Sequence, residues 1–314
     1  MIIKRIAGVE FTDNAIRAVE VNGSEKSHKI TALGSVEIND GSIQDGVIVN
    51  VQSVTAALAD LMRKFAFKTK EIIFGVDNKY VLVRYADIER KDEKDFSKDI
   101  ESQILQFLPV DKNSVVTDYL PMDDYEDGEG VKKTKTLIVA AGKKMLNDYI
   151  QVFKDCRLRI NDIDVSTLAM HRLVKVDEKD KGIAIINFKR EMFNILVINE
   201  GKPVLARNIT VDTSNAFDEA DFVNEYFKGI KKDITSSLAY YNSLTRDYIE
   251  KIYITGYGVW NENMVQFIKE NTNAEVMVVN PFTNESNKSG TPQVSRPYEF
   301  AVAYALACRG LESD

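Results

Sequence analysis

The pattern of hydrophobic and polar positions in the opening 76 residues predicts a compact α/β unit. The apolar runs "IAGVEF" and "AIRAVEV" flank the turn sequence "TDN", which predicts a β-hairpin. Residues 29–39 predict a third strand. Apolar residues spaced three or four apart between positions 54 and 65 predict a helix. The continuous apolar run "EIIFGV" at 71–76 predicts a buried strand that completes this unit.

A second unit is predicted to begin near residue 77. The alternating segment "YVLVRYADI" predicts a half-exposed strand, and a helix follows that should stop before Pro109. The strands "SVVTDYLPM" and "TKTLIVAAG" enclose an acidic, glycine-containing segment, which indicates an exposed hairpin loop. A helix with apolar residues on one face ends the unit, so its expected order is strand, helix, strand, strand, helix.

The third region, from residue 182, opens with a hairpin that has the layout of the first one. In "IAIINFKREMFNILVI", as in "IAGVEFTDNAIRAVEV", an apolar run ends near a carboxylate or amide, and a second apolar run follows a polar turn. A duplicated two-lobe architecture would produce this repetition, and chance pairing of two hairpins is the alternative. Near the end of the chain, the apolar run 300–308 predicts a buried helix, because a membrane span needs about 20 residues.

Composition narrows the function classes. The chain has 314 residues, of which 44% are hydrophobic and 28% charged, as in ordinary soluble proteins with more than one folding unit. A net charge of −7 argues against nucleic-acid binding by bulk electrostatics. The two cysteines form no CxxC pair and are predicted to be buried thiols, which suits a reducing cytoplasm. The two histidines have no metal-ligand spacing, which argues against zinc and against histidine-based nucleophilic catalysis.

Several segments, taken in order, carry a resemblance to a known family. The most distinctive are "ESQILQFLPVDKNSVVTDY" and "LIVAAGKK", and "GKPVLARNIT", "DITSSLAYYNS" and "IYITGYG" follow them. The chain resembles the PilM family of type IV pilus assembly proteins, relatives of the cell-division protein FtsA in the actin-like ATPase superfamily. The resemblance implies an α/β, actin-like (ribonuclease H-like) two-lobe fold with an inserted subdomain. The expected boundaries are 1–76, closed by 157–181 and the helix 297–310, for the first lobe, 77–156 for the inserted subdomain and 182–296 for the second lobe.

The same resemblance implies a partner. Proteins of this family are cytoplasmic, lie at the inner face of the cytoplasmic membrane through their partner, and bind the cytoplasmic N-terminal segment of the membrane protein PilN. They link PilN to the pilus motor, so the motor ATPases are further candidate partners. The groove beside the inserted subdomain would be lined by apolar residues, each of which could instead belong to the subdomain's own core: Tyr80, Val81, Val83, Tyr85, Phe107, Leu108, Pro109 and Tyr119.

The resemblance also points to a nucleotide cleft whose motifs are altered. The first hairpin of the family carries an Asp, a Gly two residues later and then small hydroxyl residues, where this chain has Glu10, Thr12, Asp13 and Asn14. Thr12 adds a Cβ where the backbone must approach phosphates. Asp13 would direct a negative charge toward an anion, and two such charges 4 Å apart repel by roughly 4 kcal/mol at an effective dielectric near 20.

The second hairpin and a glycine turn depart further from the family pattern. Asn187 and Lys189 replace an Asp and a Gly. Lys189 could touch phosphate in place of a metal, point to solvent from a turn that binds nothing, or pair with Glu10 across an empty cleft; the second interpretation is preferred. Gly256 and Gly258, separated by Tyr257, match a glycine pair near the adenosine. Asp233 matches an acidic position near the ribose, although an exposed helix face explains it better.

These substitutions together predict a scaffold rather than an enzyme. Phosphoryl hydrolysis needs a metal ion, ordered phosphates and a positioned water, and all three motifs for them are weakened. The expected binding of ATP with magnesium is therefore weak or absent, and no catalytic or metal-binding residue is assigned. The alternatives are a working actin-like ATPase or small-molecule kinase, and an FtsA-like filament-forming division protein.

Overall fold

The computed structural model describes residues 3–78, 80–91, 96–107, 111, 113–175, 182–190, 192–211, 219–259, 262–282 and 294–312. The chain divides into two compact units. The first comprises Met1–Asp77 together with Gln151–Asp314, and the second comprises Asn78–Ile150. Of the residues assigned to the candidate sites, Leu108 and Pro109 lie outside the described residues.

The first sheet of the larger unit has the strand order β10-β6-β1-β2-β3. Strands β1, β2 and β3 form an antiparallel meander, while β1, β6 and β10 run parallel. The bounds are β1 Lys4–Phe11, β2 Ala15–Ser24, β3 Ser27–Glu37, β6 Glu71–Val76 and β10 Arg159–Val165. A two-stranded ribbon, β4 Ile43–Gln44 with β5 Val47–Ile48, precedes helix α1, Val51–Lys64. Each predicted element of residues 1–76 is therefore present.

Helix α7, Ala301–Arg309, packs on β1, β2 and β6 of this sheet. Its residues from Ala301 to Ala307 are buried, so the predicted buried helix is confirmed. Gly8 on β1 permits the contact, because a Cβ at that position would lie 2.0 Å from the carbonyl oxygen of Ala303. The short helix α4, Ser166–Ala169, contacts both β6 and β10 of the first sheet and β12 and β13 of the second.

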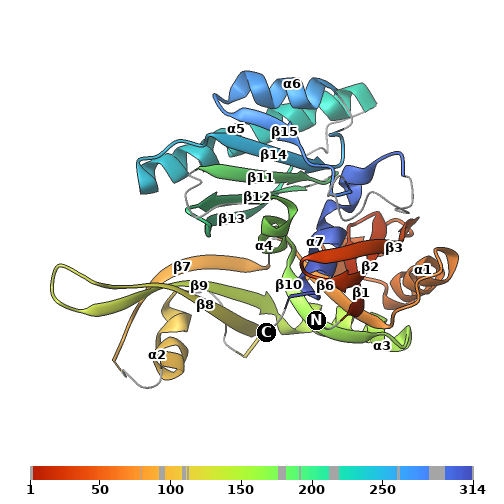
Figure 1. Cartoon of the computed structure of the whole chain (residues 1–314), viewed down its shortest axis with the longest axis horizontal. Coiled ribbons are helices and arrows are strands. Elements are labelled where there is room, and N and C mark those ends of the chain that lie inside the picture. The colour runs from red at the N-terminus through yellow and green to blue at the C-terminus, as the bar shows by residue number, and fades with distance from the viewer. Residues whose placement is uncertain are drawn as a thin grey trace. The chain divides into compact units, whose positions relative to one another are not determined.

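The second sheet repeats the plan of the first. Its order is β13-β12-β11-β14-β15, again a three-stranded antiparallel meander followed by two parallel strands. Helices α5, Glu219–Thr245, and α6, Glu262–Asn271, cover one face of it (Figure 1), and Ile230, Ile234, Met264 and Ile268 join its core. The strands are β11 Ile183–Phe188, β12 Met192–Asn199, β13 Lys202–Thr210, β14 Lys251–Gly256 and β15 Glu275–Val278. The identical topology confirms the predicted duplicated architecture.

The second unit contains an antiparallel sheet of order β7-β9-β8. Its elements are β7 Leu82–Glu89, α2 Phe96–Gln103, β8 Val115–Glu126, β9 Lys132–Gly142 and α3 Lys143–Asp155, which begins in this unit and ends in the other. Helix α2 and the 3₁₀ turn after it bury Ile100 and Ile104 against Ala86, Ile88, Ile138 and Ala140 of the sheet. The predicted order of strand, helix, strand, strand, helix is confirmed.

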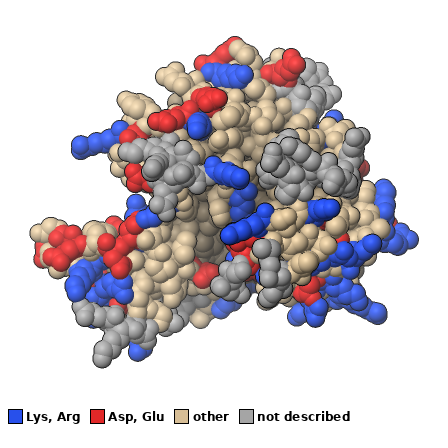
Figure 2. Space-filling model, in the orientation of Figure 1, with Lys and Arg blue, Asp and Glu red and all other residues tan. Residues whose placement is uncertain are grey.

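Two surface properties bear on function. On the face shown in Figure 2, acidic and basic side chains are interspersed, in keeping with the modest net charge of −7. None of the described helices is long and apolar enough to cross a bilayer. Cys156 and Cys308 are free and are only partly buried, so the prediction of buried thiols holds in part.

Candidate functional site

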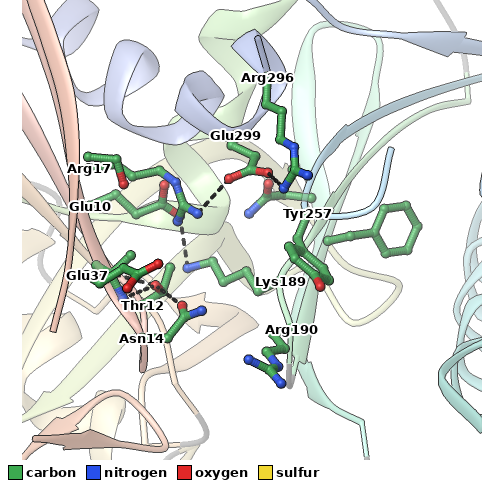
Figure 3. Close-up of a pocket in the computed structure, with 15 residues that line it drawn as sticks. Glu10, Thr12, Asn14, Arg17, Glu37, Lys189, Arg190, Tyr257, Arg296 and Glu299 are labelled. Atoms are coloured by element: carbon green, nitrogen blue, oxygen red, sulfur yellow. Dashed lines mark hydrogen bonds and ion pairs between the residues drawn. The ribbon is translucent and has the colours of Figure 1, made fainter. Parts of the chain in front are cut away.

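A cavity of about 270 Å³ lies between the two hairpins of the larger unit (Figure 3). The first sheet contributes residues from the opening hairpin, the second sheet contributes residues from its own hairpin and from the glycine turn after β14, and the segment before α7 closes the wall. The lining residues include Glu10, Thr12, Asn14, Arg17, Asn187, Lys189, Arg190, Gly256, Tyr257, Arg296 and Glu299. The structure thus brings most of the predicted nucleotide residues to one place.

Lys189 is the centre of this site. Its ammonium Nζ lies 3.1 Å from Oε1 of Glu10 and 2.7 Å from Oδ2 of Asp77. The three side chains are 7%, 4% and 5% exposed, so the cluster is buried. The preferred expectation, that Lys189 points to solvent, is therefore wrong. The ion pair with Glu10 is the alternative that the structure adopts, because the carboxylates of Glu10 and Asp77 stabilise the buried ammonium.

Burial and charge shift the pKa values of this cluster. Burial raises the pKa of the Asp77 carboxyl above its ordinary value, because it outweighs the attraction of Lys189, and the negative charge of Glu10 adds to the effect. Burial alone would lower the pKa of Lys189, but the attraction of Asp77 and Glu10 raises it overall. Lys189 is therefore an ammonium at neutral pH, and it faces two carboxyl groups.

Asn187 belongs to a row of hydrogen-bonded asparagines across the second sheet, of which Asn187 and Asn194 are buried. Asn187, Asn194 and Asn208 are cross-strand neighbours on β11, β12 and β13. The Nδ2 of Asn187 donates to Oδ1 of Asn194 at 3.2 Å, and the Nδ2 of Asn194 donates to Oδ1 of Asn208 at 3.0 Å. The asparagine at the position of the family Asp is thus part of an internal hydrogen-bond network.

The polar side chains in the turn of the first hairpin form hydrogen bonds within the turn. The Thr12 hydroxyl lies 2.9 Å from Oδ1 of Asn14 and accepts the backbone N–H of Ala15 at 3.0 Å. Both residues line the cavity. Their side chains are already engaged in closing the turn, which leaves less hydrogen-bonding capacity for a ligand.

Asp13 does not face the cavity, so the expectation that it would oppose an anion there is wrong. Its two carboxylate oxygens accept the backbone N–H groups of Asp45 and Gly46, each at 3.0 Å. Those two residues form the left-handed turn of the β4–β5 ribbon, with φ values of 51° and 67°. Consecutive backbone donors in such a turn attract a carboxylate, which explains the direction of the side chain.

Gly256 is required by the packing of β14 against β11. Its φ is +94°, and a Cβ there would lie 2.1 Å from the carbonyl oxygen of Phe188. That oxygen accepts the N–H of Tyr257 at 2.6 Å. Gly258 also has a positive φ, +79°, but an added Cβ would meet only the tip of Met264 at 3.7 Å. Asp233 lies on α5, partly exposed, and does not line the cavity.

Four of the charged residues that sequence reasoning missed at this site take part in ion pairs. Arg17 on β2 donates to Glu299 at 2.7 Å, both side chains being 12% exposed, and Arg296 lies 3.5 Å from the same glutamate. The fourth is Asp77. Two signals were available: Arg17 interrupts an apolar run, and Asp77 is the first polar residue after the buried strand β6. In Figure 3, Arg17, Glu299 and Arg296 form a chain along one wall of the cavity.

The predicted partner residues lie on the smaller unit and differ in accessibility. Tyr80 is 54% exposed and Phe107 36% exposed. Val81 and Val83 are buried, and Tyr85 and Tyr119 are partly buried, Tyr119 packing against the core around α2. Burial raises the pKa of the Tyr85 phenol well above its ordinary value. Of the set, Tyr80 and Phe107 are the described side chains best placed to meet a partner.

Comparison with known proteins decides the family. The sequence profile described as type IV pilus assembly protein PilM matches residues 8–219. The chain belongs to the PilM family of type IV pilus assembly proteins. No functionally curated protein matches its sequence. The match to the PilM profile confirms the resemblance deduced from the order of the motifs.

Solved structures confirm the actin-like fold of this PilM-family chain. One, described as a PilM-PilN type IV pilus biogenesis complex, has a TM-score of 0.83 at 18% identity and covers 98% of this chain and 99% of that one. The ethanolamine utilization protein EutJ from Carboxydothermus hydrogenoformans has a TM-score of 0.54 at 10% identity over 98% and 90% of the two chains. The cytoplasmic domain of EpsL, an inner-membrane component of the Vibrio cholerae type II secretion system, has a TM-score of 0.52 at 8% identity over 99% and 96%.

Proposed function

We propose that the chain is a scaffold of a type IV pilus assembly machine, that it binds the cytoplasmic N-terminal tail of PilN, and that its cleft does not hold ATP with magnesium. The PilM family match supports the role in pilus assembly. The similar PilM-PilN complex supports PilN as the partner. The proposal places the protein in the cytoplasm, at the inner face of the membrane, where it connects PilN with the pilus motor.

One observation carries the part of the proposal that concerns the cleft: the Lys189 ammonium is buried between Glu10 and Asp77. Magnesium needs a near-octahedral set of oxygen ligands at 2.0–2.1 Å, and carboxylates are its usual protein ligands. An ammonium about 4 Å from a divalent ion would repel it by about 8 kcal/mol at an effective dielectric of 20. The two carboxylates that would hold the ion already have a cation.

Three further features point the same way. The cavity of about 270 Å³ is below the roughly 300–1,000 Å³ typical of ligand pockets. Of the basic residues in its walls, Lys189 is paired with Glu10, and Arg17 and Arg296 are paired with Glu299, so these charges are already neutralised by protein carboxylates. Thr12 and Asn14 are bonded to their own turn. The residues present therefore do not fit a magnesium-bound triphosphate.

Isothermal titration calorimetry with Mg-ATP tests the cleft. We expect no saturable heat up to millimolar nucleotide, because the metal position is filled and the phosphate turn is closed. A dissociation constant in the micromolar range would refute this half of the proposal. It would leave the PilN half untouched, because the candidate partner residues lie on the other unit.

Fluorescence anisotropy with a labelled peptide of the PilN tail tests the partner. We expect saturable binding to the full chain. Tyr80→Ala and Phe107→Ala should each weaken binding roughly tenfold or more, since exposed aromatic side chains commonly act as binding anchors. Tyr248→Ala is the matched control, because Tyr248 is an equally large side chain, 76% exposed, that lies in the other unit.

The controls decide how a negative result is interpreted. No binding by the folded wild-type chain would contradict the assignment of PilN as the partner. Equal losses in the Tyr80, Phe107 and Tyr248 variants would contradict the assignment of the surface while leaving the partner in place. Circular dichroism of each variant shows that a loss of binding does not come from unfolding.

A further inference from the structure

The Lys189 ammonium joins three segments that are far apart in the sequence. Glu10 is the next-to-last residue of β1 in the first sheet, and Asp77 directly follows β6 of the same sheet. Lys189 follows β11 and so comes from the second sheet. Because Nζ lies within 3.1 Å of both carboxylates, this one side chain bonds the second sheet to two strands of the first.

The topology of the first sheet explains why a cation is needed at this place. Strands β1 and β6 are parallel neighbours, with Val9 opposite Phe74, so their carboxyl ends lie at the same edge. Glu10 and Asp77 are therefore brought together by the sheet itself. A buried pair of carboxyl groups without a cation would repel each other and lose their hydration. Either a bound metal ion or a protein ammonium can supply the missing positive charge.

The surroundings of Lys189 position it for this role. The N–H of Lys189 donates to the carbonyl oxygen of Met192 at 2.9 Å, which closes the tight turn of the second hairpin. In Figure 3 the Lys189 side chain extends from this turn toward Glu10, whereas that of the next residue, Arg190, extends in a different direction. Asp77 directly follows the buried strand β6, whose last residues Gly75 and Val76 are paired with β10. Both ends of the contact are thus fixed by neighbouring structure.

We propose that Lys189 is a permanently attached cation that takes the place of a metal ion and holds the two sheets of the larger unit together. This inference rests on the proposed function, since a cleft that held a magnesium-bound nucleotide would have no place for the ammonium. Lys189 is a positioning residue in this account and performs no chemistry. The contact between the sheets is then independent of nucleotide. It also holds Asp77, the last residue before the chain enters the smaller unit.

The test is cation rescue of the variant Lys189→Ala, in the full chain. Removing one partner of a buried ion pair should lower the melting temperature by roughly 6–20 °C at pH 7.5. Millimolar Mn²⁺, or propylammonium at tens of millimolar, should restore a large part of this shift. Lys29→Met is the matched control, because Lys29 is exposed on β3, and neither cation should change its melting temperature.

Electron paramagnetic resonance measures how tightly Mn²⁺ binds. Replacing a lysine that only contributes packing would not change this affinity. We expect Lys189→Ala to bind one Mn²⁺ ion at least tenfold more tightly than the wild type. The double variant Lys189→Ala/Asp77→Asn should lose that gain, because it removes one of the two carboxylates. Lys189→Ser, which also leaves room for an ion, provides a second variant if the alanine variant does not fold.

Some results would overturn the inference. The first is that the wild type binds Mn²⁺ as tightly as Lys189→Ala does. The second is that Lys189→Ala neither binds Mn²⁺ more tightly nor recovers stability when a cation is added. The third is that Lys189→Ala and Lys189→Ser both stay insoluble even when they are refolded with either cation. Each of these leaves the binding of the PilN peptide by the wild type unaffected. Failure of the inference and failure of the proposed function are therefore distinguishable.

Discussion

Replacing Asp77 by Asn should change how the stability of the protein depends on pH. The cluster places one ammonium, that of Lys189, against two buried carboxyl groups, those of Asp77 and Glu10. Burial raises the pKa of Asp77 above the ordinary value of 3.8 despite the attraction of Lys189. Between 3.8 and its raised value, the folded state therefore holds a proton on Asp77 that the unfolded state has lost.

The sign and size of the effect follow from proton linkage. Where the folded state binds more protons than the unfolded state, the free energy of unfolding falls as the pH rises. One carboxyl can contribute a slope of at most about 1.4 kcal/mol per pH unit, and only between its unfolded and folded pKa values. Asp77→Asn removes this group, so the free energy of unfolding of the variant minus that of the wild type should rise through that interval and level off above it.

Urea unfolding followed by circular dichroism, at half-unit steps from pH 4 to pH 8.5, measures this difference. Groups outside this cluster titrate alike in both proteins and cancel in the subtraction, so the shape of the difference curve reports on the cluster. An amide without a new partner can shift the whole curve by about 1–3 kcal/mol without changing its slope. A difference that is flat, or that falls as the pH rises, would refute the reasoning that burial dominates at Asp77.

Three further predictions follow from local geometry. Gly256→Ala should lower the free energy of unfolding by about 3 kcal/mol or more, because the added Cβ collides with backbone at a position of positive φ. Gly258→Ala should lower it by about 1–2 kcal/mol, because Gly258 has a positive φ without such a collision. Equal losses for the two variants in urea unfolding would contradict this. Asp13→Ala should cost about 2 kcal/mol by removing the charged acceptor of two backbone N–H groups, and hydrogen exchange should accelerate at those two amides and not in the cleft. Burial raises the thiol pKa to about 11 at Cys156 and about 12 at Cys308, so a disulfide reagent at pH 8 should label them quickly only after unfolding. Rapid labelling of the native chain would disprove the last prediction.

The order and type of the elements could be predicted from the amino-acid pattern alone. Pairs of apolar runs around a polar turn predicted the hairpins β1–β2 and β11–β12, and the three- and four-residue spacing of apolar positions predicted α1. These signals are local, since they reflect which side of a strand or helix is buried. The order of the motifs also gave the family and the duplicated fold, because a duplicated topology leaves two hairpins of the same layout in the chain.

Only the tertiary structure decided what the polar residues of the cleft do. The residues next to Lys189 in the sequence do not show that its ammonium contacts Glu10 and Asp77, which precede it by more than 100 residues. Asp13 and Asn14 are adjacent, yet one side chain caps the β4–β5 turn while the other lines the cavity. A turn residue can point in several directions at little cost in backbone energy. The choice among them depends on charges and backbone donors that the fold brings close.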